Sequence, residues 1–536
     1  MKIFDKYTVI SEGVPAEVTI SEKDEEYINT YDVKQTKIQK ATEKVLGYLK
    51  ERIIDSVNIK TSEILDPREV ETVRKKFIDK AEELVTRELI GTTEDEKKIL
   101  VSRLAHELIG LGEIELLLAD DQLEEIVINS SREPVYIYHK KYGWLKTNIL
   151  VESEEQIQNY ASIIGRKVGR QITNLSPLLD AHLTSGDRVN ATLFPISSKG
   201  NSITIRKFAK TPWTIVSLLD PQYKTLNFDI AALLWLCLQY EMNIIVGGGT
   251  ASGKTSILNA LLVFTPPNQR VVSIEDTREL YLPEYLHWTP LVTRQPNPEG
   301  KGEITMLDLM VNSLRMRPDR IVLGEVRRQR EAEVLFEAMH TGHAVYATVH
   351  ADDADQVKNR LTSPPINLPE NMLGALHLTI VQYRQRRTGI RRTFEVAEFV
   401  SRGEMVIVNK IFKWNPRQDT LDKVGEHIRL MNDLLMFSGM TSEEMLQDLE
   451  EKKRVLNYMV AHKIYNVEDV GRVVALYYRH KDRLNQIVAD NSDPREILRP
   501  GALAEPVKEQ EKEEKPAPVP ERRPAPAVPK AKTPKK

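Results

Sequence analysis

The pattern of hydrophobic positions begins with helical spacing. Apolar residues recur at this spacing from Ile38 to Ile54 and from Val70 to Leu89, and the pattern continues through Leu108 to a stop at Gly110. These positions predict a helical N-terminal region over residues 1–90.

Residues 91–218 contain several short segments rich in β-branched and aromatic residues, which are typical of strands. Glu125–Asn129, Val135–Tyr138 and Ser202–Arg206 are predicted strands, and Glu154–Val168 is a predicted helix between the second and the third. Together they predict a small α+β domain over residues 91–218.

From residue 228 onward, helical patterns alternate with short, continuously apolar runs. The predicted strands are Asn243–Val246, Val271–Ile274, Ile321–Gly324, Ala344–Val349 and Leu378–Val381. Such alternation is typical of an α/β fold whose parallel sheet is covered on both faces and binds its ligand at the carboxyl ends of the strands. We therefore expect an α/β domain over 228–400, joined to the preceding domain by a linker over 219–227.

The last part of the chain loses the strand signal. Residues 401–490 are predicted to be mainly helical, with a capping box from Thr441 to Glu444 ahead of one helix. From residue 491 to 536, prolines alternate with Lys, Glu, Arg and Ala, a composition that cannot bury a core. We expect that tail to be disordered.

Composition narrows the class of protein. The net charge of −3 over 536 residues gives no global attraction to nucleic acid, so a nucleic-acid partner is not expected. The single cysteine, Cys237, excludes an internal disulfide and a structural zinc site built on cysteine pairs. The longest apolar run, Ile230–Leu238, is too short to span a bilayer, and the first residues lack the apolar core of a signal peptide. We expect a cytoplasmic protein.

One segment carries a complete chemical motif. GGTASGKT, from Gly248 to Thr255, matches the phosphate-loop pattern GxxxxGK[ST] at every fixed position and lies between a predicted strand and a predicted helix. Backbone N–H groups of such a loop point at phosphate, and the helix dipole favours its charge. Lys254 is expected to reach the β- and γ-phosphates and the Thr255 hydroxyl to bind Mg²⁺. The predicted nucleotide-binding residues are Gly248, Gly249, Thr250, Ala251, Ser252, Gly253, Lys254, Thr255 and Ser256.

A phosphate loop needs a carboxylate from a neighbouring strand. Glu325 follows the apolar run Ile321–Leu323, so it is predicted to hold Mg²⁺ or to orient the attacking water, although Gly324 stands where an aspartate is usual. Glu275 and Glu279 follow another predicted strand and are candidates for the general base. For each acid a solvated position on the surface stays open.

Histidines and arginines accompany these strands. His343 and His350 bracket one predicted strand, where an imidazole can sense or polarise a γ-phosphate, or simply lie at the surface. Several arginines surround the run before Glu325, and some of them are expected to neutralise phosphate charge while others belong to helix surfaces. They are Arg315, Arg317, Arg320, Arg327, Arg328 and Arg330.

Taken together, these motifs resemble the secretion ATPase superfamily, the motors of type II secretion, type IV pili, archaella and type IV secretion. GGGTASGKT is similar to the family's phosphate loop, SIEDTREL to its acidic box, RIVLGEVR to its second carboxylate motif and MHTGHAVYATVHA to its histidine box. Upstream, PLLDA, SGDRVN and IRKF are similar to the N-domain signature, and RPDR and FKWNPR look most like the archaeal branch. The resemblance covers roughly residues 95–480.

The resemblance implies a homohexameric ring of RecA-like ATPase domains, each joined to a PAS-like N-domain, with ATP and Mg²⁺ between the two. By position, Arg188 and Arg206 are the N-domain arginines that would approach the γ-phosphate. The implied partner is a polytopic membrane platform protein, and the implied location is the cytoplasmic side of the membrane. The four-cysteine zinc module of some family members cannot be built from one cysteine.

Three functions remain open from the sequence. The first is a motor ATPase that assembles, secretes or rotates a pilus-like filament. The second is an ATPase for DNA transfer in conjugation or uptake, which lacks support from any basic–aromatic track. The third is a nucleotide-switched scaffold with little turnover. A small-molecule kinase is disfavoured because the sequence shows neither a lid nor an acceptor pocket.

Overall fold

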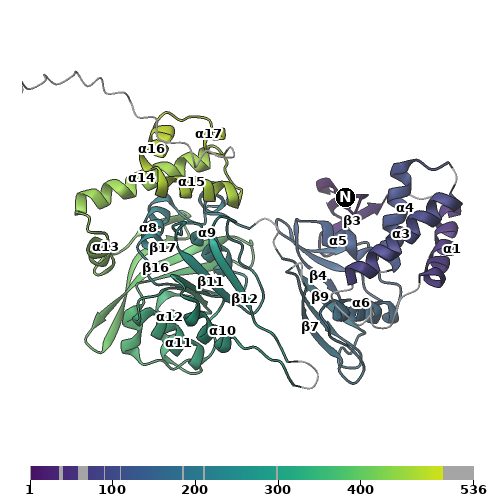
Figure 1. Cartoon of the computed structure of the whole chain (residues 1–536), viewed down its shortest axis with the longest axis horizontal. Coiled ribbons are helices and arrows are strands. Elements are labelled where there is room, and N and C mark those ends of the chain that lie inside the picture. Colours follow the sequence, from purple (N-terminus) through teal and green to yellow (C-terminus); the bar gives the residue numbers. More distant parts are fainter. Residues whose placement is uncertain are drawn as a thin grey trace, which may run out of the picture.

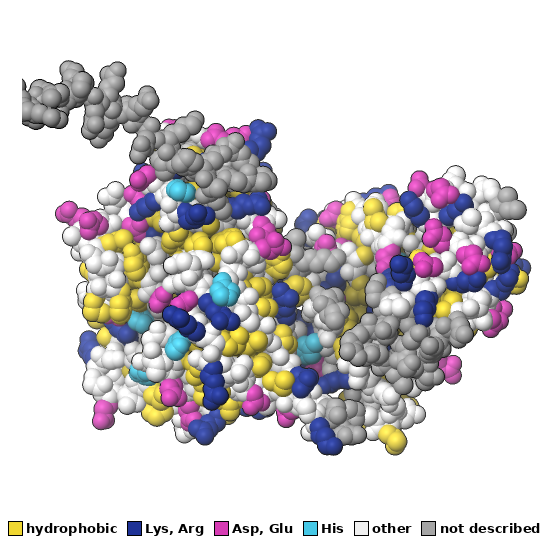
Figure 2. Space-filling model, in the orientation of Figure 1, with side chains coloured by type: hydrophobic (Ala, Val, Ile, Leu, Met, Phe, Trp, Pro, Cys, Tyr) yellow, Lys and Arg dark blue, Asp and Glu magenta, His cyan; other side chains and the backbone are white. Residues whose placement is uncertain are grey.

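The computed structural model describes residues 2–35, 40–57, 70–89, 91–108, 110–183, 186–208, 212–296 and 300–498. These residues fold into two lobes (Figure 1), each built on one nine-stranded sheet. The α/β class predicted from the sequence is confirmed. Basic and acidic side chains are interspersed over the face shown in Figure 2, as expected for a chain with 29% charged residues.

The sheet of the N-terminal lobe runs in the order β1-β2-β3-β6-β5-β4-β9-β8-β7. All of its neighbouring strands are antiparallel except β3 and β6. The strands are β1 (Lys2–Ser11), β2 (Val14–Glu22), β3 (Thr30–Gln35), β4 (Leu123–Ile128), β5 (Tyr136–His139), β6 (Gly143–Thr147), β7 (Leu178–His182), β8 (Arg188–Thr192) and β9 (Ser202–Arg206).

The helices of this lobe are α1 (Lys40–Ser56), α3 (Val70–Glu88), α4 (Glu94–Leu108), α5 (Ile114–Ala119) and α6 (Glu154–Lys167). The first three pack on one another through a small core of their own that includes Leu49 and Leu84. In contrast, α5 and α6 contribute to the core beneath the sheet. The Ser153 side chain caps α6 by accepting a hydrogen bond from Gln156 N, which fixes the start of that helix.

The predicted helical character of residues 1–90 is wrong for the first third of the segment. The strands β1, β2 and β3 precede α1 and join the N-terminal sheet through β6. In β2, the buried side chains of Val14, Ala16, Val18 and Ile20 alternate with less buried ones, which is the period of a half-buried strand. The helical spacing further along does correspond to α1 and α3.

The sheet of the C-terminal lobe runs in the order β12-β11-β13-β14-β10-β15-β16-β17-β18. Its pairings from β12 to β15 are parallel, and those from β15 to β18 are antiparallel. The strands are β10 (Ile244–Gly248), β11 (Arg270–Glu275), β12 (His287–Val292), β13 (Arg320–Leu323), β14 (Ala344–Val349), β15 (Leu378–Arg384), β16 (Arg391–Arg402), β17 (Met405–Asn415) and β18 (Thr420–Lys423).

Helices cover both faces of this sheet. One core lies under α10, α11 and α12, and another lies under α7, α8, α9 and the C-terminal helices. The α-helices are α7 (Ile215–Leu219), α8 (Phe228–Gln239), α9 (Lys254–Leu262), α10 (Met306–Ser313), α11 (Gln329–His340), α12 (Ala354–Thr362), α13 (Leu430–Ser438), α14 (Ser442–Ala461), α15 (Val467–Arg479), α16 (Lys481–Ala489) and α17 (Arg495–Leu498). Short 3₁₀ turns are η2 (Leu314–Met316) and η3 (Glu370–Ala375).

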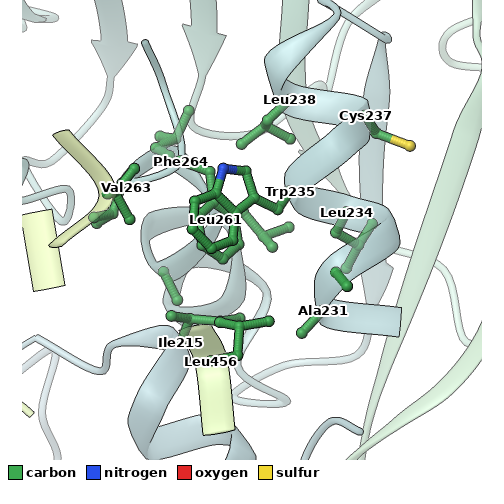
Figure 3. Packing of buried hydrophobic residues seen from close by; sticks show 14 of the residues in the cluster. Ile215, Ala231, Leu234, Trp235, Cys237, Leu238, Leu261, Val263, Phe264 and Leu456 are labelled. Atoms are coloured by element: carbon green, nitrogen blue, oxygen red, sulfur yellow. The ribbon is translucent and has the colours of Figure 1, made fainter. Parts of the chain in front are cut away.

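Trp235 of α8 lies at the centre of the larger core (Figure 3). Its ring is fully buried and stacks on Phe264, just beyond the end of α9, with centroids 4.7 Å apart. The indole N–H donates to Tyr478 Oη at 3.0 Å, and Leu456 of α14 packs beside the same cluster. This packing holds α9, the helix that follows the phosphate loop, between α8 and the C-terminal helices.

Two expectations for the end of the chain are corrected. Residues 401–490 begin with β17 and β18, which extend the sheet, and the helices start only at Leu430. The predicted tail begins too early, because α17 buries Ile497 in the large core. The expectation for residues 499–536 lies outside the described residues. The predicted capping box at Thr441 and Glu444 is confirmed at the start of α14.

No helix within the described ranges combines the length and the apolar character that a bilayer span requires.

Candidate functional site

The phosphate loop joins β10 to α9 with a tight backbone. Gly248 has φ +153° and Gly253 has φ +98°, conformations that favour glycine. A Cβ at Gly248 would lie 2.4 Å from Ser252 Oγ and 2.7 Å from Gln382 O. Both glycines of the motif are thus required by the shape of the loop.

Lys254 is folded onto this loop. Its Nζ donates to Gly248 O at 2.9 Å and Gly249 O at 3.0 Å. Burial lowers the pKa of Lys254, and the carboxylates of Glu325 and Glu279 oppose that shift. No side chain caps the N-terminus of α9, so the first N–H groups of the helix are open to an anion. The loop therefore fits a polyphosphate.

The loop opens into a cavity of about 1390 Å³ between the two lobes. The volume exceeds the ~300–1,000 Å³ of a usual ligand pocket, so the cavity is large enough for a nucleotide. All three predicted acids, Glu275, Glu279 and Glu325, line the same cavity as the phosphate loop. The candidate acids and the loop therefore face one another at the carboxyl edge of the sheet.

Glu275 is the most buried of these acids, with 2% of its surface exposed. Its Oε1 accepts hydrogen bonds from Glu279 N at 2.9 Å and Leu280 N at 3.1 Å, while Oε2 is buried without a partner. Burial raises the pKa of Glu275 to about 7. The Glu275 carboxylate therefore fixes the turn that carries Glu279. Because its pKa is near neutral, the same carboxylate can accept or donate a proton at physiological pH.

Glu325 is held by Arg327. Two nitrogens of Arg327 donate to Glu325 Oε2 at 3.0 and 2.7 Å, and a third donates to Asp276 Oδ2 at 2.7 Å. The guanidinium therefore links the loop after β11 to the loop after β13. Gly324, which stands where an aspartate is usual, lies next to Glu275. A Cβ built on Gly324 would be 3.5 Å from Glu275 Cγ, which is an ordinary van der Waals contact.

Mg²⁺ usually keeps several waters and binds one or two protein oxygens together with phosphate oxygens. The described residues hold no cluster of three or more His, Cys, Asp or Glu that would bind a metal without a nucleotide. Thr255 and Glu325 both line the cavity beside Lys254, and their hydroxyl and carboxylate oxygens are the hard donors this ion prefers. The donor set suits Mg²⁺ bound together with phosphate.

The N-terminal lobe lines the cavity with residues of β4, β5, β6, β8 and β9. Arg206 Nη2 lies 3.7 Å from Glu279 Oε1 of the other lobe. Arg188 also lines the cavity, but its Nε and Nη2 donate to the carboxylate of Asp180, at 3.2 and 2.9 Å. His182 Nδ1 shares a 2.7 Å hydrogen bond with Thr277 Oγ1 across the lobes.

The two candidate histidines lie at opposite ends of β14. His350 Nε2 shares a 3.0 Å hydrogen bond with Thr250 Oγ1 of the phosphate loop. His343 precedes β14 and contacts Thr341 and Ala338, at the opposite edge of the sheet. At about 3.3 Å per residue, the strand puts roughly 20 Å between the two residues. The structure therefore removes His343 from the nucleotide site.

Among the arginines, Arg320 is a structural residue. It is fully buried, donates to Gln269 Oε1 at 2.6 Å and lies over the ring of Tyr346. It therefore does not contribute to a phosphate site, whereas Arg327 lines the cavity.

Two residues had no assigned role from the sequence: Arg391, which lines the cavity, and Asp180, which binds the cavity residue Arg188. Arg391 Nε donates to Ala251 O of the phosphate loop at 3.1 Å, although more than a hundred residues separate them. Asp180 holds Arg188, and only its place in the PLLDA segment marks it in the sequence. No local pattern marks Arg391, because its contact is made by the fold.

A family model described as "Type II/IV secretion system protein" matches residues 150–384. An uncharacterized protein of Methanocaldococcus jannaschii is 34% identical over 398 residues, covering 73% of this chain and 71% of that protein. A putative conjugal transfer protein of Mycobacterium tuberculosis is 30% identical over 327 residues, covering 58% of this chain and 89% of that protein.

Among solved structures, the pilus retraction motor PilT with bound ADP is 16% identical, covers 72% of this chain and 98% of its own, and has a TM-score of 0.38. The two sequence similarities cover 71% and 89% of the relatives' own lengths, at 34% and 30% identity. They agree with the sequence prediction of a P-loop NTP hydrolase, which is confirmed at the level of the family. The chain belongs to the type II/IV secretion system ATPase family.

Proposed function

We propose that this chain is a hexameric motor ATPase, which hydrolyses ATP to drive assembly, secretion or rotation of a type IV pilus-like filament through a membrane platform protein. The observation that carries the proposal is the meeting of the two lobes at the phosphate loop. Arg206 of one lobe lies beside Glu279 of the other, in the cavity that Lys254 also lines. A motor needs such an arrangement, because hydrolysis there changes the charges between two parts that can move.

Each residue has a role in this proposal. Lys254 and the N–H groups of residues 248–256 bind the triphosphate, and Thr255 and Glu325 hold Mg²⁺. Glu279 accepts the proton of the attacking water, while Glu275 shapes the turn and shares the proton through its raised pKa. Arg206 neutralises charge on the terminal phosphate, and Arg188 joins it after leaving Asp180. His350 reports phosphate state through Thr250.

The larger architecture is part of the same proposal. We assign the C-terminal lobe a RecA-like role and the N-terminal lobe a PAS-like one. The connection between them lies ahead of the linker predicted over 219–227, because α7 already packs in the core of the C-terminal lobe. Six copies form a ring on the cytoplasmic side of the membrane, against a polytopic platform protein. Family membership and the two-lobed cavity support this assignment.

The proposal is tested by measuring ATP hydrolysis against protein concentration, with particle mass determined by light scattering on the same samples. A ring motor gives Mg²⁺-dependent turnover that rises as particles of six chains form. A scaffold would assemble but release almost no phosphate. Turnover by a single chain that does not change with assembly would contradict the hexameric motor.

A DNA-transfer ATPase is the second candidate, favoured by the name of the mycobacterial relative, a putative conjugal transfer protein. One local feature supports it: Trp144 packs edge to face on Tyr138, and Arg384 of the other lobe lies over the same tyrosine. Aromatic and basic side chains together bind single strands. Stimulation of hydrolysis by single-stranded DNA, lost at high salt, would select this function over a filament motor.

A further inference from the structure

The phosphate loop has a positive φ at three residues, and one of them is not a glycine. Besides Gly248 and Gly253, Ala251 has φ +57°. Left-handed turns bring successive backbone N–H groups to one side, which forms a concavity for anions. Glycine adopts a positive φ without strain, whereas the Cβ of an alanine crowds the following carbonyl oxygen. Ala251 is therefore a strained point of the loop, and its conformation needs support from other residues.

The residues on either side of Ala251 are held by their own side chains. Thr250 Oγ1 shares a 3.0 Å hydrogen bond with His350, and Ser252 Oγ donates to a carbonyl of the loop at 2.9 Å. The methyl group of Ala251 can make no such bond. Its carbonyl oxygen instead accepts a hydrogen bond from Arg391 Nε at 3.1 Å. The support for this turn therefore comes from a residue 140 positions further along the chain.

Arg391 is well placed to give this support. Its Cδ lies 3.8 Å from the position that a Cβ on Gly253 would take, so the side chain covers the loop at a second residue. The next residue, Arg392, is buried and donates to both carboxylate oxygens of Asp419, at 2.7 and 2.8 Å. This pair fixes the start of β16, and with it the backbone from which the Arg391 side chain extends.

The far side of the Arg391 guanidinium faces the N-terminal lobe. Its Nη2 lies 3.7 Å from Glu124 Oε2 of β4, and both residues line the cavity. The guanidinium is thus oriented by the loop carbonyl through Nε and by an acid through Nη2. Because Glu124 balances its charge, Arg391 is placed to support the loop rather than to bind a phosphate oxygen directly.

We propose that Arg391 is a positioning residue of the nucleotide site, which holds Ala251 in the left-handed conformation that turns the loop N–H groups toward phosphate. This inference rests on the proposed function, because it concerns the loop that binds the triphosphate there. The hydrogen bond to Ala251 O offsets the strain at that residue, so the loop has its binding shape before the nucleotide arrives. Separation of the lobes removes Glu124, one of the two groups that orient Arg391, so lobe position acts on the phosphate loop.

The test measures the affinity for inorganic tripolyphosphate with Mg²⁺ by titration calorimetry on the full chain. It compares the wild type, Arg391→Ala, Ala251→Gly and the variant with both substitutions. Arg391→Ala should weaken binding about tenfold, the effect of one hydrogen bond from a charged donor. In the Ala251→Gly background, the same substitution should weaken binding only about twofold or less, because glycine adopts the left-handed conformation without support.

Arg387→Ala is the matched control for charge. Arg387 is exposed in the turn between β15 and β16 and lines the same cavity. Its removal takes an equal charge from the cavity and leaves the bond between Arg391 and Ala251 in place. We expect a loss of about twofold or less, the same with alanine or glycine at position 251.

Two outcomes overturn the positioning role. One is an equal loss of affinity from Arg391→Ala in both backgrounds, which would mean that Arg391 acts through its charge or through general packing. The other is a loss no larger than that of Arg387→Ala. The stoichiometry of each titration gives the fraction of chain that binds, so the affinity is measured even for a variant that folds incompletely.

The proposed function fails in a different way. A wild type that binds neither ATP nor tripolyphosphate would overturn that function, and this inference with it. A wild type that binds and hydrolyses ATP, with equal losses in the two backgrounds, would overturn the role of Arg391 alone.

Discussion

The guanidinium of Arg206 and the carboxylate of Glu279 lie 3.7 Å apart, although one belongs to the N-terminal lobe and the other to the nucleotide lobe. In the proposed function, this pair forms when no phosphate competes for the arginine. A γ-phosphate between them would take the arginine and free the acid for water. We propose that nucleotide chemistry acts on lobe position through this pair.

Arg206→Ala should lower the rate of ATP hydrolysis on the order of 10³-fold, because an arginine that neutralises transition-state charge has an effect of about that size. Hydrolysis is measured by phosphate release at saturating ATP. Arg166→Ala is the matched control, since that arginine lies on α6 and donates to Ser162 O of its own helix. Full activity of Arg206→Ala would contradict the assigned role.

The two histidines provide a paired test of the site's position. His350→Ala removes a hydrogen bond to Thr250 of the phosphate loop and should reduce hydrolysis about tenfold, the effect of roughly one such bond. His343→Ala should leave the rate unchanged, because its contacts are at the opposite edge of the sheet. Equal losses in the two variants would show that His343 acts in the reaction after all.

Glu275 should make stability depend on pH. Its pKa is raised to about 7 in the folded chain, so the folded state holds a proton that the unfolded state has released above pH ~4.5. Its contribution is therefore full below pH ~4.5 and is lost as the pH rises to about 7, a loss of roughly 3 kcal/mol in the free energy of unfolding.

Glu275→Gln, which cannot ionise, should lack this part of the pH dependence. The check is urea denaturation of both proteins at several pH values, with their difference plotted against pH. A difference that stays constant from pH ~4.5 to about 7 would refute the buried, proton-sharing environment of Glu275.

Trp235→Ala should cost about 3–5 kcal/mol of unfolding free energy, the usual range for an aromatic residue removed from a core. The ring is fully buried and stacks on Phe264 at the end of α9. Trp144→Ala, at a ring that is 46% exposed, should cost far less. Thermal unfolding followed by circular dichroism measures both, and similar losses would contradict the central place of Trp235 in the core.

Local patterns were sufficient to predict the strands that carry the site. The runs before Gly248, Glu325 and His350 are continuously apolar because their strands are buried on both faces, and β10, β13 and β14 lie where these runs predict. The pattern does not reveal β12, since that strand lies at the edge of the sheet, with Pro290 in it and most side chains half exposed or exposed.

The loop motif could be predicted residue by residue, whereas contacts across the fold could not. Arg391 contacts Ala251, and His182 contacts Thr277. Each pair is far apart in the sequence, and no sequence pattern around either residue predicts that the two meet. The separation of His343 from His350 follows from strand geometry. The six residues of β14 lie between them, and only the carboxyl end of the strand, where His350 lies, meets the phosphate loop.

The most direct test of the proposed site is ATP binding and hydrolysis by Lys254→Ala beside the wild type. Lys254 lies on the loop carbonyls of Gly248 and Gly249, in the cavity that the three acids line. We expect Mg²⁺-dependent phosphate release by the wild type and none above background by the variant, with the folded structure retained in both. Turnover by Lys254→Ala at the wild-type rate would show that the phosphate loop is not the site of hydrolysis.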